Sequence, residues 1–383
     1  MRRTRQTTLG LVAVIAALGL TACGSDDDEP APANGGGTTA AATAGGDGVA
    51  QAKAAVTKAE RTTGVTFPQP DEAFDPGSGK VAVISCGQAG LNCKQGSDDV
   101  RTAAAAMGWK ASPVFDGEFA PAKQAGYVQQ ALREGYDAIV LVSIDANSIK
   151  AALDAAAAKD VPVACVMCAN KDFPGVIDVT SGGVADGTAI ADWITADSDG
   201  KAKLLAYDDK SFPIVAERLA AMKARLAEVC PDCTVDDASI PTTDLSKPGP
   251  PTWTAALAKY PAGKLGYVMA PYDPFAIPFT KTAEQRSRTD LKIGGYDASP
   301  DFVALIAAGN GPAKVTTAAP FPYASWGAMD QVARVKAGKQ PWKSTELPVA
   351  LVTAQNAAEF DEGFFSPDDF DYQALFKRLW GKS

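Results

Sequence analysis

The chain has 383 residues, of which 46% are hydrophobic and 21% are charged, and its formal net charge is −9. It contains no histidine, which excludes Ser/His/Asp and Cys/His hydrolases and a histidine-bound zinc site, although carboxylate or lysine catalysis stays open. An acidic balance without a basic cluster argues against nucleic acid and anionic lipid as partners.

The first 22 residues have the layout of a secretory signal peptide, with early arginines and a short apolar run over residues 9–20. Small residues then lead to Cys23. This junction resembles the bacterial lipobox, in which the cysteine is acylated and becomes the mature N-terminus. The resemblance implies an extracytoplasmic protein held on the outer face of the cell membrane by lipid on Cys23. The alternative is an ordinary signal peptide, with Cys23 incidental.

Residues 23–50 are predicted to form a flexible tether. From residue 24 to residue 48 the chain has no large apolar side chain, so it buries too little surface to offset its ordering entropy. Residues 51–79 are expected to form an N-terminal arm, a helix followed by a proline-containing segment. The remaining length exceeds what one core usually serves, so we expect two lobes.

From residue 80 the chain alternates between predicted strands and helices. The first cycle consists of expected strands at 80–85, 112–115, 138–142 and 161–166, and expected helices at 95–107, 121–134 and 148–159. Because apolar strands are separated by helices, a parallel sheet covered on both faces is expected.

The second cycle begins after Ile177. It consists of expected helices at 187–195, 214–229, 252–259, 275–286 and 300–308, and expected strands at 202–207, 234–238, 265–269, 292–296 and 315–319. The predicted fold is α/β, with two doubly wound, Rossmann-like parallel-sheet lobes and a hinge. Ligands of such sheets bind at the carboxyl ends of the strands.

Six further cysteines are close neighbours in sequence: Cys86 with Cys93, Cys165 with Cys168, and Cys230 with Cys233. In an exported protein an even number favours disulfides, although six cysteines allow fifteen connectivities, and local pairing is the simplest. Two pairs have CxxC spacing, which also allows metal or thiol redox chemistry. An extended strand end would hold the sulfurs of the 165/168 pair too far apart unless the chain turns.

Four passages, taken in order, resemble type I periplasmic solute-binding proteins of the ribose-binding branch. They are residues 121–129, 139–145, 158–163 and 294–301. The pattern from Cys86 to Cys93, followed by Gly108 and Trp109, is similar to a subgroup of sugar-binding lipoproteins. The likeness runs over residues 80–353. It implies a monomer without enzyme activity or cofactor, which closes on a small-molecule ligand and delivers it to the permease subunits of an ABC importer.

The resemblance also implies how the chain divides. We expect an N-terminal lobe of residues 80–181 plus 320–348 and a C-terminal lobe of residues 182–319 plus 349–356. Residues 357–383 are expected to be a tail packed on a lobe, because their aromatic side chains would otherwise form an exposed apolar patch.

The loops after the strands should supply the ligand cleft. The resemblance implies ligand contacts from Gln88, Asn92, Asp116, Ser143, Asp145, Met167, Asn170, Phe212, Tyr272, Asp273, Asp297 and Phe321. Each has a structural alternative. Asp145 and Asp297 can cap helices, and Phe212 and Phe321 can belong to the core.

The expected cleft departs from ribose-type binders. Ribose-type binders carry an Asp-Arg pair after the fourth strand, where this chain has Met167 and Cys168. After the last strand of the second lobe they carry a glutamine, where this chain has Ala319 or Pro320. An arginine expected at the start of the helix after the sixth strand is absent from residues 213–217. Without an arginine a strongly anionic ligand is disfavoured. We predict a small neutral ligand, which is a sugar or a related, less polar or aromatic compound.

Two other functions stay open. The same binding protein can present its ligand to a receptor, as a sensor component. Alternatively, two carboxylates among Asp116, Asp273 and Asp297 can form a glycosidase pair.

Overall fold

The computed structural model describes residues 40–170, 173–247, 249–360 and 363–382. The chain divides into a unit Met1–Ala40 and a compact unit Ala41–Ser383. The predicted signal peptide, Cys23 and most of the tether lie outside the described residues, so the fold described below is that of the second unit. None of the helices in the described part of the chain combines the length and hydrophobicity that crossing a bilayer requires.

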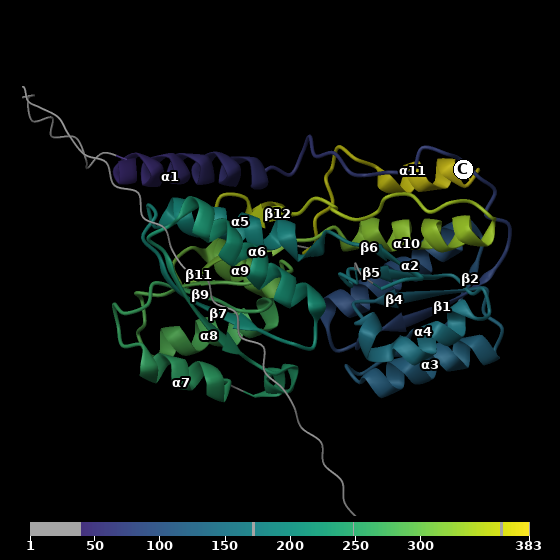
Figure 1. Ribbon diagram of the computed structural model, residues 1–383, viewed down its shortest axis with the longest axis horizontal. Coiled ribbons are helices and arrows are strands. Elements are labelled where there is room, and N and C mark those ends of the chain that lie inside the picture. Colours follow the sequence, from purple (N-terminus) through teal and green to yellow (C-terminus); the bar gives the residue numbers. More distant parts are fainter. Residues whose placement is uncertain (1–39, 171–172, 248, 361–362, 383) are drawn as a thin grey trace, which may run out of the picture. The chain divides into compact units, whose positions relative to one another are not determined.

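The N-terminal lobe is built on a parallel sheet with the order β2-β1-β4-β5-β6, in which β3 also pairs with β1 (Figure 1). Its strands are β1 (Lys80–Ser85), β2 (Lys110–Ala111), β3 (Phe115–Asp116), β4 (Ala138–Val142), β5 (Val163–Val166) and β6 (Val176–Val179). Every residue of β4 and β5 is buried, because helices cover both faces of the sheet. This burial explains the continuous apolar runs in the sequence.

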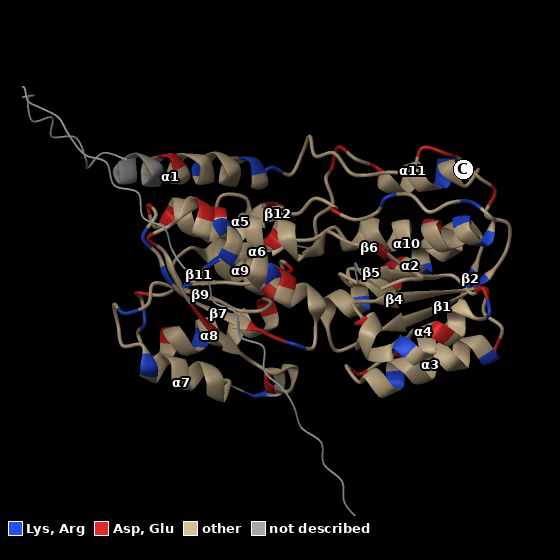
Figure 2. Ribbon diagram, in the orientation of Figure 1, with Lys and Arg blue, Asp and Glu red and all other residues tan. Residues whose placement is uncertain are grey.

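Two pairs of helices cover that sheet (Figure 1). One face carries α3 (Pro121–Arg133) and α4 (Lys150–Ala157), which follows the short helix η1 (Ala146–Ile149), and the other carries α2 (Leu91–Met107) and α10 (Phe321–Lys336). Charged side chains lie mainly on helices and connecting segments, and the strands of this sheet are largely free of them (Figure 2).

The C-terminal lobe is built on a second sheet with the order β12-β11-β10-β9-β7-β8. Its strands are β7 (Lys203–Asp208), β8 (Thr234–Ser239), β9 (Tyr267–Met269), β10 (Lys292–Gly294), β11 (Ala313–Ala318) and β12 (Ala350–Val352). The strands pair in parallel except β12, which runs antiparallel to β11.

The helices of the C-terminal lobe also lie on two faces (Figure 1). They are α5 (Gly182–Asp197), α6 (Pro213–Val229), α7 (Pro251–Lys259), α8 (Asp273–Gln285) and α9 (Pro300–Ala308), with the short helix η2 (Thr242–Ser246) before α7. Alternate side chains of β7 enter different cores, since Leu204 packs with the α5–α6 pair and Leu205 with the α7–α8 side. The predicted fold class, two parallel-sheet lobes, is confirmed.

Several predicted elements differ in detail from the structure. The strand expected at 112–115 is instead two short strands, β2 and β3, because Pro113 has no N–H to donate. Between them, the Ser112 hydroxyl accepts a hydrogen bond from the Val83 N–H at 3.0 Å. Helix α5 begins at Gly182, five residues before the predicted start, and within it Gly183 and Gly187 pack closely against α6. Helix α10 and strand β12 were not predicted.

The predicted tether extends too far. Helix α1 (Ala40–Ala59) includes residues 40–50, because alanine has the highest helix propensity and packing adds to it. At Gly48 the helix approaches the end of α6 so closely that a Cβ would lie 2.4 Å from the Val229 carbonyl oxygen. Lys53 also pairs with Asp199 at 2.9 Å.

The later part of the arm and the end of the tail pack on the N-terminal lobe. The Phe67 ring lies 4.9 Å from that of Tyr323 on α10, whose hydroxyl donates to the Pro68 carbonyl. In the tail, η3 (Ala357–Glu359) precedes α11 (Tyr372–Leu379), which lies along α10 (Figure 1). Trp380, directly after α11, stacks on Trp326 with ring centroids 5.5 Å apart.

Asp99 on α2 offers a test of the lobe's pH dependence. One carboxylate oxygen is buried without a hydrogen-bond partner, and the other accepts from Gln95 at 3.1 Å. Burial raises the pKa of Asp99 to about 6. The folded state therefore binds this proton more tightly than the unfolded chain, so stability is lost as pH rises from about 4 through about 6. At pH 7.5 we expect Asp99→Asn to have a free energy of unfolding about 2–3 kcal/mol higher than that of the unchanged protein. Below pH 4 we expect no difference between the two.

Urea unfolding at pH 7.5 and at pH 3.5 measures this difference. The exposed neighbour Asp98, which pairs with Lys94, provides a control, and Asp98→Asn should change stability by less than about 0.5 kcal/mol. An Asp99→Asn gain that is the same at both pH values would contradict the assignment to this carboxyl group.

Candidate functional site

A cavity of about 930 Å³ lies between the two lobes. This volume lies in the range of roughly 300–1,000 Å³ that small-molecule pockets occupy. From the N-terminal lobe the lining comes from residues 89–93 and from the loops after β3, β4 and β5. From the C-terminal lobe it comes from the start of α6, from η2, and from the loops that follow β9 and β10. The cavity thus stands at the carboxyl ends of the parallel strands of both sheets.

The backbone is strained at several lining residues. Phe119, Ser143, Met167 and Asp297 all have positive φ, at 54°, 51°, 52° and 95°. Such angles are uncommon for residues with a side chain and cost about 1–3 kcal/mol each. Each residue stands shortly after a strand, where the chain turns away from the sheet. Strain of this kind clusters at ligand sites.

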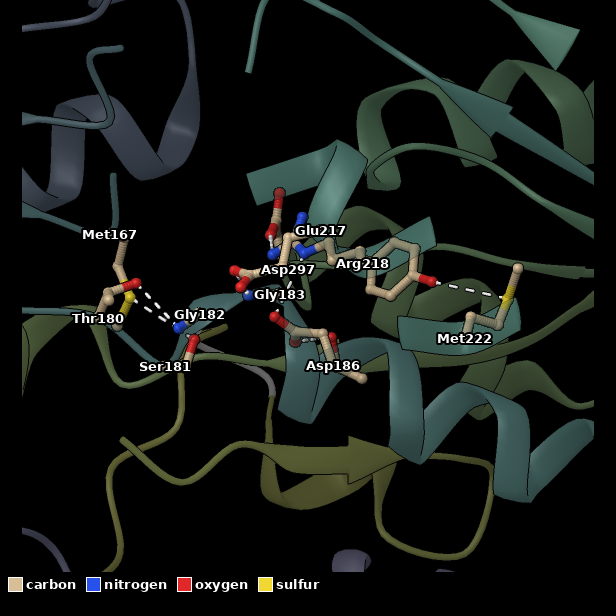
Figure 3. Close-up of polar contacts among 12 residues, drawn as sticks. Met167, Thr180, Ser181, Gly182, Gly183, Asp186, Glu217, Arg218, Met222 and Asp297 are labelled. Carbon is tan, nitrogen blue, oxygen red and sulfur yellow. Dashed lines mark hydrogen bonds and ion pairs between the residues drawn. The ribbon is translucent and has the colours of Figure 1, made fainter. Parts of the chain in front are cut away.

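Arg218 and Asp297 line the cavity, and with Asp186 they form a largely buried ion triad (Figure 3). Arg218 on α6 donates from Nε to Asp186 at 3.2 Å and from Nη2 to Asp297 at 2.6 Å. The side chains of Arg218 and Asp186 are 5% and 0% exposed, and that of Asp297 is 18% exposed. Thr317 donates to Asp186 at 2.5 Å, and the Arg218 guanidinium lies 4.7 Å from the centre of the Tyr296 ring. Of the two carboxylates, Asp297 is the one that can reach a ligand.

Close packing of α5 against α6 makes this triad possible. A Cβ at Gly183 would lie 2.5 Å from the Arg218 backbone nitrogen, and one at Gly187 would lie 2.2 Å from its carbonyl oxygen. Only glycine allows this approach, which brings Arg218 to Asp186 on α5.

The positive charge of Arg218 is fully compensated within the triad, because it faces two carboxylates. Burial raises the pKa of Asp186, and the charge of Arg218 opposes that rise. Burial lowers the pKa of Arg218, but the charges of Asp297 and Asp186 outweigh it and raise that pKa above its ordinary value. The prediction that the cleft lacks an arginine is therefore wrong, because Arg218 is one residue beyond the stretch considered. Its charge is nevertheless shared between two carboxylates, so it offers little to an anion.

A family model for the periplasmic binding protein domain matches residues 93–340. The chain belongs to this family. The family implies an extracytoplasmic location, which agrees with the sequence-based expectation. No match is found among curated protein sequences.

Solved structures share the fold of this periplasmic binding protein. An ABC sugar transporter subunit from Rhodobacter sphaeroides is 24% identical with a TM-score of 0.64, over 73% of this chain and 99% of that one. The Caulobacter myo-inositol binding protein is 19% identical with a TM-score of 0.65, and the match covers 77% of this chain and 98% of that one. The periplasmic binding protein of the arabinose ABC transporter from Shewanella sp. ANA-3 is 17% identical with a TM-score of 0.65, and the match covers 78% of this chain and 98% of that one. The predicted type I periplasmic binding protein fold is confirmed.

The structure brings together more than half of the predicted contact residues. Those that line the cavity of the binding protein are Asn92, Ser143, Met167, Phe212, Tyr272, Asp297 and Phe321. Tyr272 presents its ring, because its hydroxyl already donates to Asp209 at 2.8 Å. These residues come from both lobes, as a site that closes between lobes requires.

Three predicted acceptors are instead used by the loops of the protein itself. Asp145 accepts from the Asn147 N–H at 2.9 Å and caps η1. Asn170 is buried, accepting from the Ala146 N–H at 3.1 Å and donating to the Ile144 carbonyl at 3.0 Å. Asp273 is fully buried and accepts from the Ser299 N–H at 2.7 Å and the Thr316 hydroxyl at 2.8 Å. None of these three residues lines the cavity.

Asp116 and Gln88 also lie outside the cavity lining. Asp116 accepts from the Gln88 N–H at 2.9 Å and the Glu118 N–H at 3.0 Å, and Gln88 donates to the Ser85 hydroxyl at 2.8 Å. They shape the loop after β1 rather than the cleft surface. Of the three carboxylates considered for a glycosidase, only Asp297 lines the cavity.

Sequence reasoning missed much of the apolar lining. The additional lining residues include Leu91, Phe119, Ile214, Val215, Leu245, Pro274, Ile277 and Pro300. Phe119 follows a predicted strand closely and could have been found by the rule applied to the other loops.

The six described cysteines lie in the three local pairs expected. The Cα–Cα separations are 5.8 Å for Cys86 and Cys93, 5.8 Å for Cys165 and Cys168, and 5.3 Å for the third pair. These values lie within the range that disulfides span. The separation of Cys165 and Cys168 is compatible with a disulfide because the chain turns at Met167, directly after β5. Within the described residues, no group of acidic or cysteine side chains is placed to hold a metal ion.

Proposed function

We propose that this periplasmic binding protein captures a small neutral solute with several hydroxyl groups and delivers it to the permease subunits of an ABC importer. The observation that carries the proposal is Asp297, held by Arg218 at the wall of a cavity between two lobes. A carboxylate accepts hydrogen bonds from hydroxyl groups, and these are strong when the acceptor is charged. The similar structures from Caulobacter and Shewanella hold myo-inositol and L-arabinofuranose, which supports a polyol or sugar.

Capture by hinge closure fits the path of the chain. The chain passes between the two sheets after β6, after β11 and between α10 and β12. At the first, the Thr180 N–H donates to the Ser344 carbonyl at 3.1 Å, and the Thr180 carbonyl accepts from Leu347 at 3.1 Å. A ligand that contacts both lobes stabilises the closed arrangement relative to the open one.

The anchoring and cross-linking of the protein belong to the same proposal. Lipid on Cys23 would keep a monomeric binding protein concentrated near its importer. The three cysteine pairs would be disulfides of an exported protein, with no catalytic role. In particular, the 86/93 pair would fix the loop that supplies Leu91 and Asn92 to the cavity.

Identification of the bound solute tests this function. The protein is dialysed against a metabolite extract, retained compounds are identified by mass spectrometry, and each is titrated by calorimetry. We expect saturable one-to-one binding without turnover. Conversion of the retained compound to a product would favour an enzyme, and retention of no small molecule would contradict the proposal.

Asp297→Ala should weaken binding of the retained solute by about 10- to 100-fold, because a charge-assisted hydrogen bond is lost. The melting temperature should change by only a few degrees, since Arg218 keeps its contact with Asp186. Asp154→Ala, which removes an exposed carboxylate paired with Lys150, is the matched control and should bind normally. Unchanged affinity in the Asp297 variant would refute its role.

A further inference from the structure

The cavity has a marked division between charged and apolar surface. Its charged lining residues, Arg218, Asp297 and Asp301, all belong to the C-terminal lobe. Among the described residues that line it from the N-terminal lobe, none is charged, and the polar side chains are Asn92 and Ser143. One side of a bound molecule therefore meets mostly apolar surface.

Phe119 is built into this apolar wall. Its backbone is left-handed, with φ 54°, and the preceding Glu118 has φ 47°. Gly87 and Gly90 make room for the ring, because a Cβ at these positions would approach it to 2.7 Å and 3.2 Å. Phe119 is partly buried, so its ring packs against the core of the N-terminal lobe on one side and lines the cavity on the other.

Apolar surface continues from Phe119 into the other lobe. The Phe119 ring meets that of Phe212 edge to face at 6.4 Å, and Phe212 meets Tyr272 at 6.0 Å. Leu91, in the same wall, is 41% exposed and is one of the few large hydrophobic side chains with such exposure among the described residues. These side chains together form a continuous apolar part of the cavity lining. An aliphatic group such as Leu91 or Ile277 cannot bind the hydroxyls of a sugar.

The groups that can bind hydroxyls gather in one place. Asp297 and Ser299 follow β10, and Asp297 contacts Arg218 at 2.6 Å. The Ser299 hydroxyl oxygen is buried without a hydrogen-bond partner and its residue lines the cavity. An unpaired buried hydroxyl is costly unless a ligand satisfies it.

We propose that the ligand is a neutral molecule with two parts, a hydroxyl-bearing part bound by Asp297, Arg218 and Ser299, and an aromatic ring bound against Leu91, Phe119 and Phe212. Aryl glycosides and aryl-substituted polyols have this chemistry. The inference rests on the proposed function, since it names the class of solute that the same cavity captures. A simple sugar would satisfy the charged end and leave the apolar wall uncovered.

Matched pairs of glycosides test the inference. Phenyl and methyl β-D-glucopyranoside share their hydroxyl groups and differ in the ring, and the corresponding galactopyranosides and ribofuranosides extend the comparison. We expect calorimetry to show that the phenyl member of at least one pair binds about 10- to 100-fold more tightly, the gain from burying an aromatic ring. Phe119→Leu and Phe212→Leu should reduce this preference, measured within each variant as the ratio of phenyl to methyl glycoside affinity, so that a general loss of affinity or stability does not count toward it. Asp297→Ala should weaken both members.

The outcomes separate the inference from the proposed function. Three outcomes would overturn the inference. The phenyl glycosides could bind no more tightly than the methyl glycosides, the preference for the phenyl member could survive both phenylalanine variants, or none of the glycosides could bind. If free sugars or polyols from the metabolite extract are still retained, the proposed function stands without it. Retention of no solute from the extract or from the glycoside set would overturn both.

Discussion

An Arg218→Met variant is expected to lose about 3–5 kcal/mol of unfolding free energy, because removing one partner of a buried ion pair leaves the other uncompensated. Asp186 is fully buried, and besides Arg218 its side chain is contacted by the Thr317 hydroxyl. Methionine retains much of the apolar stem, so the loss reports the missing guanidinium rather than a cavity. Urea unfolding measures the change, and ligand binding should be lost together with the anchoring of Asp297.

Lys223→Met is the matched control for this variant. Lys223 lies on the same helix and pairs with Asp237, but both side chains are more than 40% exposed, so a change below about 1 kcal/mol is expected. An Asp186→Asn/Arg218→Met double variant should recover part of the loss, because the fully buried position 186 then carries no charge, although Asp297 still lacks its partner. Equal stability of the Arg218 and Lys223 variants would show that the triad does not stabilise the fold.

The architecture could be predicted from sequence because its signals are local. Runs such as Ala138–Val142 are apolar throughout, and amphipathic segments such as Pro121–Arg133 lie within a few residues of them. Helix α10 was harder to recognise, because it is buried on nearly all sides and begins with Phe321 and Pro322. Strand β12 has only three residues, Ala350–Val352, and it forms by pairing with β11.

The site could be predicted only in part, for a physical reason. Ser143, Met167 and Asp297 line the cavity because each follows a strand within three residues, where the chain turns away from the sheet. Asp145 and Asn170 occupy similar positions, but short polar side chains also bind nearby backbone N–H groups. The sequence does not distinguish these two uses.

Other site residues depend on contacts that are distant in sequence. Arg218 reaches the cavity because glycines on another helix admit α6, and Phe119 is positioned by Gly87 and Gly90, about thirty residues earlier. Neither relation appears in the pattern of one segment. The ligand class inferred from the apolar wall therefore required the structure.

Asp330→Ala should destabilise the protein by about 3–5 kcal/mol and release the C-terminal tail, because one fully buried carboxylate joins three donors. It accepts from the Trp380 indole N–H at 2.8 Å and the Trp342 indole N–H at 2.9 Å, and it pairs with the buried Arg334. Alanine leaves a buried guanidinium and two indole N–H groups without their acceptor. Hydrogen exchange of α11 should accelerate, and urea unfolding should shift to lower concentration.

Two further variants separate the causes of that effect. Asp371→Ala removes only the cap of α11, where the carboxylate accepts from the Ala374 N–H at 2.8 Å, and should cost about 1 kcal/mol. Asp330→Asn keeps an acceptor for an indole N–H but leaves Arg334 without its countercharge. If Asn restores most of the stability that Ala loses, hydrogen bonding to the tryptophans holds the tail. If Asp330→Asn is as unstable as Asp330→Ala, the buried ion pair with Arg334 is decisive. If the amides of the tail stay protected from hydrogen exchange in both variants, aromatic stacking on α10 alone holds the tail.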